Sequence, residues 1–591
     1  MTRKPLTLTL LAAYFHACME WLFFVTTPSS LSTLTLLESL SVLFITGGVI
    51  AFVLVIFWLL LYIPAKKWDW LAYIPAAFML SITALIMLDN FTYTVFNIGV
   101  VSAFGAWRIV YIAIWILLFY WMSRFTTRTH LWKSASTLAF SLLAFSSALT
   151  LLTYVSRDVP YNPLNSASAQ TGSPRPNIII LGADGLNASY LSAYGFDEDT
   201  TPFISELIKT SLVAENAFPN ASSTTASTTS ALTGKEPAEV MVYRYPDILN
   251  GNDSFEHLPG ILKDLGYQTA QIGTPSYVDA RKVNLIDGFD MVNGQTIHQP
   301  ALDSLRAILG NSPATYFIQL VSQRVGERFL HIFFIRDMDN PIQQVHNQTA
   351  RYTDAQRVDE IINLLETSQR PLFIFSHFMN THGPHFGSEE KAAEPESSDD
   401  EAEWDVDLYK EAILSFDAHV ESIYQYLVDS GQLDNTILVI YTDHGYRYVV
   451  NRRTPLIFHF PNGEHAGTRS NNVQVIDIPA TLLDYVEIPQ PAWMTGTSIL
   501  TADPDPLREL ISITAGSPRK IAPPFYQIKI VQVIVCHKWY SLNVQENIWK
   551  SDDIDGHTAP CDASLLPSED AMREKIVEYL RGYEYDVSLI E

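Results

Sequence analysis

The chain has 591 residues, of which 48% are hydrophobic and 17% charged. It is too long for one compact domain, and its composition suits a membrane portion joined to a soluble portion. A formal net charge of -25 and an isoelectric point near 4.9 exclude the basic surface that nucleic acid binding requires. Three cysteines are too few for a disulfide scaffold.

Five long apolar segments precede residue 156. They cover roughly residues 6–25, 42–63, 71–88, 110–122 and 137–155. Most approach the ~20 residues that a helix needs to cross a bilayer. Residues 1–155 are therefore predicted to form a five-helix transmembrane region. The first segment lacks a small-residue cleavage site and further spans follow it, so it is not read as a signal peptide.

Basic residues mark alternate loops between these segments. They are Arg3, Lys4, Lys66, Lys67, Arg124, Arg128 and Lys133. The other two loops, residues 26–41 and 89–107, contain no lysine or arginine. Because cytoplasmic loops carry the basic residues, we expect a cytoplasmic N-terminus and an extracytoplasmic chain beyond residue 156.

A segment rich in Pro, Ser, Asn and Gly, residues 156–176, is predicted to be a linker. Beyond it, short aliphatic runs indicate buried strands: NIIILGADG, PLFIFSHF and NTILVIYTDHG. A helical pattern such as residues 408–430 lies between them. This alternation predicts an α/β domain over residues 177–591, with a mostly parallel central sheet covered by helices and a sheet extension over about 501–591.

Two features of this domain leave alternatives open. Residues 388–407 are densely acidic without apolar spacing, which is typical of a solvated surface loop and also compatible with a lid over a site. Cys536 and Cys561 could pair in an oxidising compartment, but nothing in their spacing demands it.

Several ligand-type residues follow the predicted strands directly. Asp184 ends the first strand, and Asp443 and His444 end the strand ILVIYT. In parallel sheets, sites collect beyond the carboxyl ends of the strands, so we expect these side chains to share a metal ion. A hydroxyl-rich run, residues 219–235, leads into a short helix whose N-terminus would favour an oxyanion.

Other candidates surround this set. His377, His382 and His385 lie close together near a strand end, where imidazoles could bind ester oxygens or protonate a leaving group. Arg452 and Arg453 follow the Asp443-His444 pair and are interpreted either as anion-binding residues or as surface charges. His465 is a weaker candidate for the substrate or a second ion.

Taken together, these segments resemble the alkaline phosphatase superfamily, specifically its sulfatase-like branch, over roughly residues 177–500. NIIILGADGLNASYLSAYG is similar to the opening strand and first metal acid of the family. TTASTTSALTGK occupies the place of the sulfatase signature, with Thr224 at the nucleophile position. LKDLGYQTAQIG, IDGFD, YTDHG and VIDIPATLLDYVEIP are similar to further landmarks.

The chain also departs from the sulfatase pattern. A sulfatase carries Cys or Ser at the nucleophile position, and threonine cannot give the formylglycine aldehyde. Thr228 replaces the arginine of the signature, and Gly185 replaces its second acid. The threonine nucleophile resembles membrane phosphoethanolamine transferases and lipoteichoic acid synthases, which also carry five spans, a linker and an outward catalytic domain. Those enzymes usually have Glu where this chain has Asp184.

The resemblance implies a phosphotransferase of the bacterial inner membrane whose catalytic domain faces the periplasm. It would bind one divalent metal ion through Asp184, Thr224, Asp443 and His444. Zinc or manganese suits tetrahedral N/O ligation, and calcium or magnesium is not excluded. Thr224 would take a phospho-headgroup from a membrane lipid donor and pass it to a lipid or glycan acceptor, with His382 or His385 assisting. The alternatives are a hydrolase of phosphate or sulfate esters and a non-catalytic sensor or scaffold.

Overall fold

A computed structural model describes residues 3–591 except 27–33, 97–99, 101–106, 132, 157–174, 246, 250, 275–276, 286, 297–303, 306–307, 310–311, 334–352, 385, 387–402, 501–504, 506, 518–524 and 526. Most of the predicted linker and most of the acidic segment lie outside these residues. The chain divides into two compact units. The first comprises Met1–Pro160, Asn250–Asn252 and Gln299–Asn340, and the second comprises the rest.

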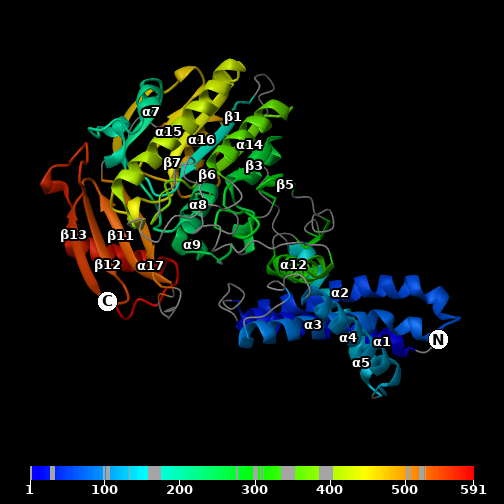
Figure 1. Cartoon of the computed structure of the whole chain (residues 1–591). Coiled ribbons are helices and arrows are strands. Elements are labelled where there is room, and N and C mark those ends of the chain that lie inside the picture. The colour runs from blue at the N-terminus through cyan, green and yellow to red at the C-terminus, as the bar shows by residue number, and fades with distance from the viewer. Residues whose placement is uncertain are drawn as a thin grey trace. The chain divides into compact units, whose positions relative to one another are not determined.

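Five helices of the first unit occupy the five predicted apolar segments (Figure 1). They are α1 (Lys4–Thr26), α2 (Leu36–Ala65), α3 (Ile74–Phe96), α4 (Trp107–Arg128) and α5 (Ala135–Ser156). Each is long and apolar enough to cross a membrane by length and composition. Helix α4 is longer than the predicted residues 110–122, because it begins at Trp107 and continues to Arg128.

A further helix of the first unit, α12 (Pro313–Phe333), comes from the part of the sequence that the prediction assigned to the catalytic domain. Val325 and Phe329 pack against the apolar core of the bundle. Phe317 contacts the ring of Trp21, with the ring centroids 5.3 Å apart. The described part of the first unit therefore contains, besides the five apolar helices, the helix α12, which composition alone did not reveal.

Two ion pairs join α12 to the first and third helices of the bundle. Arg324 Nε lies 2.7 Å from Glu20 Oε2, and Arg328 Nε lies 2.7 Å from Asp89 Oδ2. Arg324 also donates to Asn90 Oδ1 at 3.2 Å. The two carboxylates are buried, and a buried charge that loses its partner costs about 3–5 kcal/mol. The pairs thus fix which face of α12 meets the bundle.

A charge-reversal cycle tests this docking. Glu20→Arg and Arg324→Glu should each lower the thermal unfolding midpoint of the detergent-solubilised full-length protein, because each leaves like charges buried together. The double variant should recover much of the loss, since the pair is restored in reverse. The docking would be contradicted by single variants whose unfolding midpoint equals that of the parent. It would also be contradicted by a double variant whose midpoint falls by the sum of the two single losses.

The second unit is built on a mixed sheet that, among the described residues, has nine strands in the order β5-β4-β3-β6-β1-β7-β8-β2-β9. The strands are β1 (Asn177–Ala183), β2 (Leu212–Phe218), β3 (Gln268–Ile272), β4 (Met291–Val292), β5 (Gln295–Thr296), β6 (Leu372–Phe378), β7 (Thr436–Thr442), β8 (Leu456–His459) and β9 (Gly467–Gln474). Only the β4–β5 pair and the two pairs made by β8 are antiparallel in this sheet. The predicted α/β fold with a mostly parallel sheet is confirmed.

The central strands are buried on both faces because helices cover each side (Figure 1). Along β1, Ile178 and Ile180 face one core, whereas Ile179 and Leu181 face the other. The first core includes residues of α8 (Thr224–Thr233), α10 (Leu258–Asp264) and α16 (Asp477–Tyr485). The second includes residues of α7 (Pro202–Leu207), α14 (Asp354–Thr367) and α15 (Val406–Asp429). An unbroken aliphatic run is what a strand packed on both faces requires.

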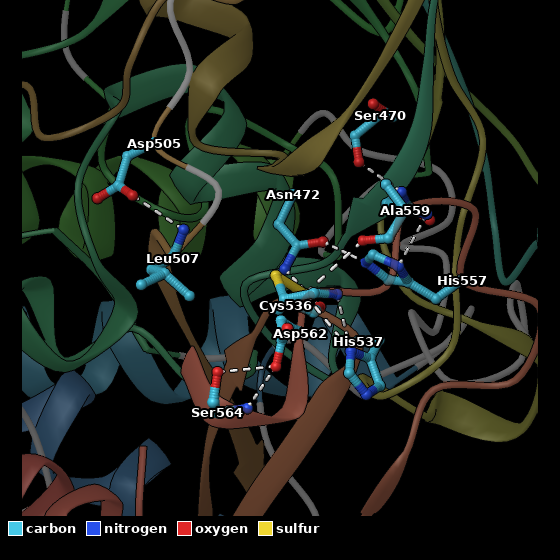
Figure 2. Close-up of a disulfide and its surroundings, with 12 residues drawn as sticks. Ser470, Asn472, Asp505, Leu507, Cys536, His537, His557, Ala559, Asp562 and Ser564 are labelled. Atoms are coloured by element: carbon cyan, nitrogen blue, oxygen red, sulfur yellow. Dashed lines mark hydrogen bonds between the residues drawn. A yellow bond between two sulfur atoms is a disulfide. The ribbon is translucent and has the colours of Figure 1, made fainter. Parts of the chain in front are cut away.

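The C-terminal part forms a separate antiparallel sheet rather than more strands of the main one. Its strands are β10 (Glu509–Ala515), β11 (Ile528–Val535), β12 (Lys538–Asn543) and β13 (Ile548–Asp553), and α17 (Glu569–Gly582) packs on them. Cys536, in the turn after β11, forms a disulfide with Cys561 (Figure 2). The structure thus resolves the pairing that the spacing left open.

Candidate active site and metal centre

Sheet register brings two predicted ligands together. Ala183 of β1 lies beside Thr442 of β7, so the next residues, Asp184 and Asp443, leave the sheet side by side at its carboxyl edge. Gly185 follows with a φ of 73°, in the left-handed region that glycine adopts without strain. A Cβ on Gly185 would lie 3.5 Å from the His444 ring, which is an ordinary van der Waals distance, so the backbone conformation rather than lack of space favours glycine here.

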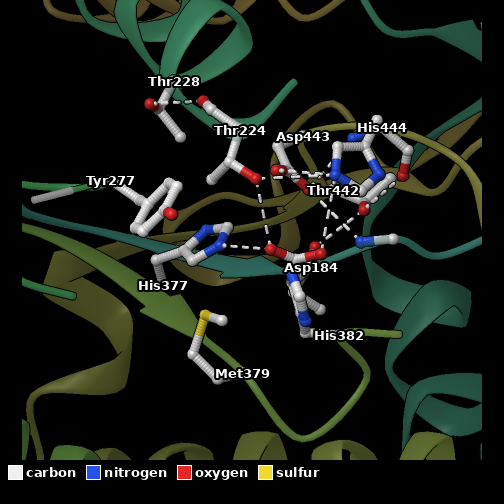
Figure 3. Close-up of polar contacts among 12 residues, drawn as sticks. Asp184, Thr224, Thr228, Tyr277, His377, Met379, His382, Thr442, Asp443 and His444 are labelled. Carbon is white, nitrogen blue, oxygen red and sulfur yellow. Dashed lines mark hydrogen bonds and ion pairs between the residues drawn. The ribbon is translucent and has the colours of Figure 1, made fainter. Parts of the chain in front are cut away.

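Thr224 reaches the same edge from the first position of α8. Its hydroxyl donates to Asp184 Oδ2 at 3.3 Å and lies 3.5 Å from His444 Nε2 (Figure 3). Ser223 precedes the helix, but its hydroxyl donates to the Tyr243 carbonyl instead of capping the first turn. The first N–H groups of α8 therefore receive no side-chain cap from Ser223, which suits an oxyanion held beside Thr224.

In each of the two aspartates, one carboxylate oxygen accepts hydrogen bonds and the other accepts none from the described residues. Asp184 Oδ2 accepts from Thr224 and His377, and Asp443 Oδ1 accepts from the backbone N–H groups of Gly185 and His444. Asp184 Oδ1 and Asp443 Oδ2 are buried and accept no hydrogen bond. Buried carboxylate oxygens without donors carry a large desolvation penalty, which a bound cation would offset.

His444 completes the set with a defined tautomer. Its Nδ1 lies 3.1 Å from the Gly445 carbonyl, which accepts its proton, and this leaves the Nε2 lone pair facing the carboxylates. Ligand atoms of Asp184, Asp443 and His444 all lie within 4.8 Å of one another. The residues therefore fit one divalent ion with oxygen and nitrogen ligands, and Thr224 Oγ1 lies where a fourth ligand would be.

The ionisation state of Asp184 agrees with this role. Burial raises its pKa, but nearby His382 and His444 and the hydrogen bond from His377 outweigh burial and hold the pKa below its usual range. Burial lowers the pKa of His377, whereas its bond to Asp184 and the charge of Asp443 raise it, and the net shift is upward. Asp184 is thus kept ionised, and His377 keeps its proton on the nitrogen that faces Asp184.

The three predicted histidines occupy different places. His377 is fully buried behind Asp184, so it supports that ligand rather than presenting a surface to substrate. His382 is partly exposed beside the cluster, and its Nε2 lies 3.5 Å from the Tyr448 hydroxyl. His385 lies outside the described residues.

The predicted arginines and the last histidine are not brought to the cluster. Arg452 pairs with Asp555, and Arg453 donates to the Glu215 carbonyl at 3.0 Å. His465 precedes β9 at the amino edge of β2, where Gly467 pairs with Leu212. Thr224 follows the opposite end of β2, which is seven residues long, so roughly 20 Å of strand separate them.

Other residues complete the rim of the site, and the sequence did not single them out. Asp184, Gly185 and His444 line a small hollow together with Thr381, Gly383, Trp404, Tyr446, Arg447 and Tyr448. The Tyr448 ring packs against His444, with centroids 4.8 Å apart, and its hydroxyl donates to the Gly383 carbonyl. Closeness to the Asp443-His444 pair in sequence was the only available signal for Arg447 and Tyr448.

A family model described as Sulfatase matches residues 176–488, which is more than half of the chain. The chain belongs to the Sulfatase family. The matched part contains the four residues of the cluster and most of the large sheet. Family membership indicates an enzyme that hydrolyses or transfers esters, and sulfatase-family enzymes use a metal ion.

Curated relatives of this Sulfatase-family chain are distant. It is 20% identical over 407 residues to an N-acetylglucosamine-6-O-sulfatase of Bacteroides thetaiotaomicron, a match that covers 55% of this chain and 70% of that protein. It is 30% identical over 103 residues to an extracellular sulfatase SULF-1 homolog of Drosophila melanogaster, covering 15% of this chain and 9% of that protein.

Solved structures similar to this Sulfatase-family chain include a phosphonate monoester hydrolase of Agrobacterium radiobacter. The identity is 16% and the TM-score 0.47, over 69% of this chain and 95% of that one. Another is an alkaline phosphatase superfamily protein from Vibrio parahaemolyticus, with 15% identity, a TM-score of 0.46, and coverage of 74% and 96%.

Metal content tests the ligand set. Full-length protein loaded with zinc or manganese and then desalted should retain close to one ion per chain, and Asp443→Asn should lose most of it because an anionic ligand is gone. His377→Gln should weaken metal affinity roughly 10- to 100-fold, as expected for a group that orients a ligand.

Asp417→Asn is the matched control for this measurement. Asp417 is also a buried aspartate of the same domain, but it accepts the N–H groups of Phe203 and Ile204. The Asp417→Asn variant should therefore retain as much metal as the parent protein. Equal metal retention by Asp443→Asn and the parent would contradict the ligand assignment.

Proposed function

We propose that the protein is a membrane-anchored, metal-dependent hydrolase of phosphate or sulfate esters with Thr224 as its nucleophile. The observation that carries this proposal is the Thr224 hydroxyl, which points at Asp184 and His444 within a buried Asp/Asp/His cluster. Sulfatase-family membership supports ester hydrolysis independently of that geometry. A divalent ion bound there, zinc or manganese by preference, would lower the pKa of the threonine hydroxyl and make it nucleophilic near neutral pH.

The reaction divides into two steps on this chain's own groups. Thr224 Oγ1 releases its proton to solvent water and attacks the phosphorus or sulfur of the ester, forming a new ester bond to threonine. The bond to the leaving alcohol breaks, and that oxygen takes a proton, for which partly exposed His382 is the proposed donor. Water then attacks the threonine ester, which releases inorganic phosphate or sulfate and restores the hydroxyl.

The surroundings of Thr224 support attack at an anionic centre. The uncapped first turn of α8 offers N–H groups toward the developing negative charge. Thr228, at the place of the arginine in the sulfatase signature, donates to the Thr224 carbonyl and holds the same turn. The Thr228 hydroxyl is thus bonded to the backbone, and this position carries a neutral group where a sulfatase carries a cation.

Transfer of a phospho-headgroup from a lipid donor to a lipid or glycan hydroxyl is the second candidate. One observation favours it: five helices are apolar enough to hold the enzyme in a membrane. The proposed threonine ester would also be a covalent intermediate that any hydroxyl acceptor could resolve. We also propose the predicted topology, with the second unit outside the cytoplasm, and the Cys536–Cys561 disulfide is consistent with such a compartment.

Substitution of the nucleophile tests the proposal. Thr224→Ala in the metal-loaded full-length protein should reduce turnover of aryl phosphate and aryl sulfate esters on the order of 10³-fold or more, as removal of a nucleophile does in other covalent mechanisms. Thr224→Ser should keep measurable activity and yield a peptide carrying the trapped phosphate or sulfate by mass spectrometry.

Thr225→Ala serves as the control, because the next hydroxyl along α8 donates only to the Tyr277 carbonyl among the described residues. It should retain activity. Turnover by Thr224→Ala close to the parental rate would reject the proposal. With a phospholipid donor, free headgroup phosphate indicates hydrolysis, and a modified lipid or glycan indicates transfer.

A further inference from the structure

The turn that follows β7 combines two unusual backbone conformations. Arg447 and Tyr448 have φ values of 59° and 61°, so two consecutive residues other than glycine adopt the left-handed conformation. Each such residue is strained and persists only where its surroundings hold it. Here the Tyr448 hydroxyl donates to the Gly383 carbonyl at 3.2 Å, and Gly445 N–H donates to the Val449 carbonyl at 3.0 Å. These two hydrogen bonds hold the turn, so the Arg447 side chain leaves the backbone in a direction set by the left-handed conformation.

Arg447 lies at the rim of the hollow that contains the metal ligands. Its guanidinium carbon is 5.6 Å from the centre of the Trp404 ring and 5.4 Å from that of Tyr446. Both rings line the same hollow as Asp184 and His444. Stacking on aromatic faces orients a guanidinium while leaving its N–H groups available.

The charge of Arg447 is not neutralised by an ion pair with any carboxylate that the structure describes. This is notable in a chain with 63 acidic and 38 basic residues other than histidine. Arg452, five residues later, is paired with Asp555. Among the described residues, Arg447 therefore presents a cation without a carboxylate partner beside a site that we propose takes an anionic ester.

We propose that Arg447, which is exposed at the rim of this hollow, binds the non-bridging anionic oxygens of the substrate there. The inference rests on the proposed function. It assigns anion binding to Arg447, which lines the same hollow as Asp184 and His444, instead of to Arg452 and Arg453, for which the sequence left that role open. A planar guanidinium pairs with two oxygens of a tetrahedral phosphate or sulfate group, which an ammonium cannot do with the same geometry. The ligand class is thus a tetrahedral oxyanion carried on an ester.

Binding of inorganic phosphate and of inorganic sulfate to the metal-loaded full-length protein, by calorimetry, tests this inference without turnover. Arg447→Ala should weaken binding of at least one anion about tenfold or more, because a hydrogen bond to a charged group contributes that much. Arg447→Lys should fall between the parent and Arg447→Ala. Arg452→Ala, the matched control, removes an arginine of the same loop and should bind like the parent.

Two results would overturn the inference. One is phosphate and sulfate binding by Arg447→Ala within twofold of the parent. The other is an equal loss in Arg452→Ala, which would indicate a diffuse effect of net charge. Should Arg447→Ala fold poorly, Arg447→Lys and Arg447→Gln decide the question by the same measurement.

Failure of the proposed function would give a different pattern. Thr224→Ala removes the nucleophile but not Arg447, so it should lose turnover and keep anion binding. Turnover that survives in Thr224→Ala rejects the nucleophile whatever Arg447 does. Normal anion binding in Arg447→Ala, together with lost turnover in Thr224→Ala, rejects only the role of Arg447.

Discussion

Asp184 and Asp443 are two buried carboxylates that face each other across one edge of the sheet, and the site depends on how their charge is balanced. Burying a single unpaired carboxylate is costly, and burying two close together is costlier still. Backbone N–H groups, Thr224 and His377 satisfy one oxygen of each carboxylate. The remaining oxygens accept no hydrogen bond from the described residues and lie 3.5 Å from His444 Nε2, which is the arrangement that a divalent cation would stabilise.

The fold supplies this arrangement through strand register. Parallel strands β1 and β7 end level with each other, so ligands that are 259 positions apart in sequence leave the sheet together. Helix α8 then adds the proposed nucleophile, Thr224, at its first turn, where N–H groups and the helix dipole favour negative charge. The same unbroken aliphatic runs that let the strands pack on both faces therefore also set the geometry of the site.

The sequence predicted those parts that follow from local pattern. Aliphatic runs marked the buried strands, and a ligand directly after such a run marked Asp184 and the Asp443-His444 pair. Residues whose position depends on strand direction were harder to place. His465 follows the antiparallel strand β8 and so lies at the opposite edge, which no local pattern reveals.

The sequence did not single out Arg447 and Tyr448, because their left-handed backbone is a property of the folded turn. Helix α12 was missed because two arginines interrupt its apolar pattern, and their partners lie far away in sequence.

X-ray absorption spectroscopy at the metal edge of the loaded full-length protein tests the central claim most directly. The account predicts one bound ion whose ligands are oxygen and nitrogen, with the scattering signature of one imidazole, and a reduced oxygen contribution when Asp184 is replaced by asparagine. An ion bound by two or more imidazoles or by sulfur, or a spectrum unchanged by that substitution, would contradict it.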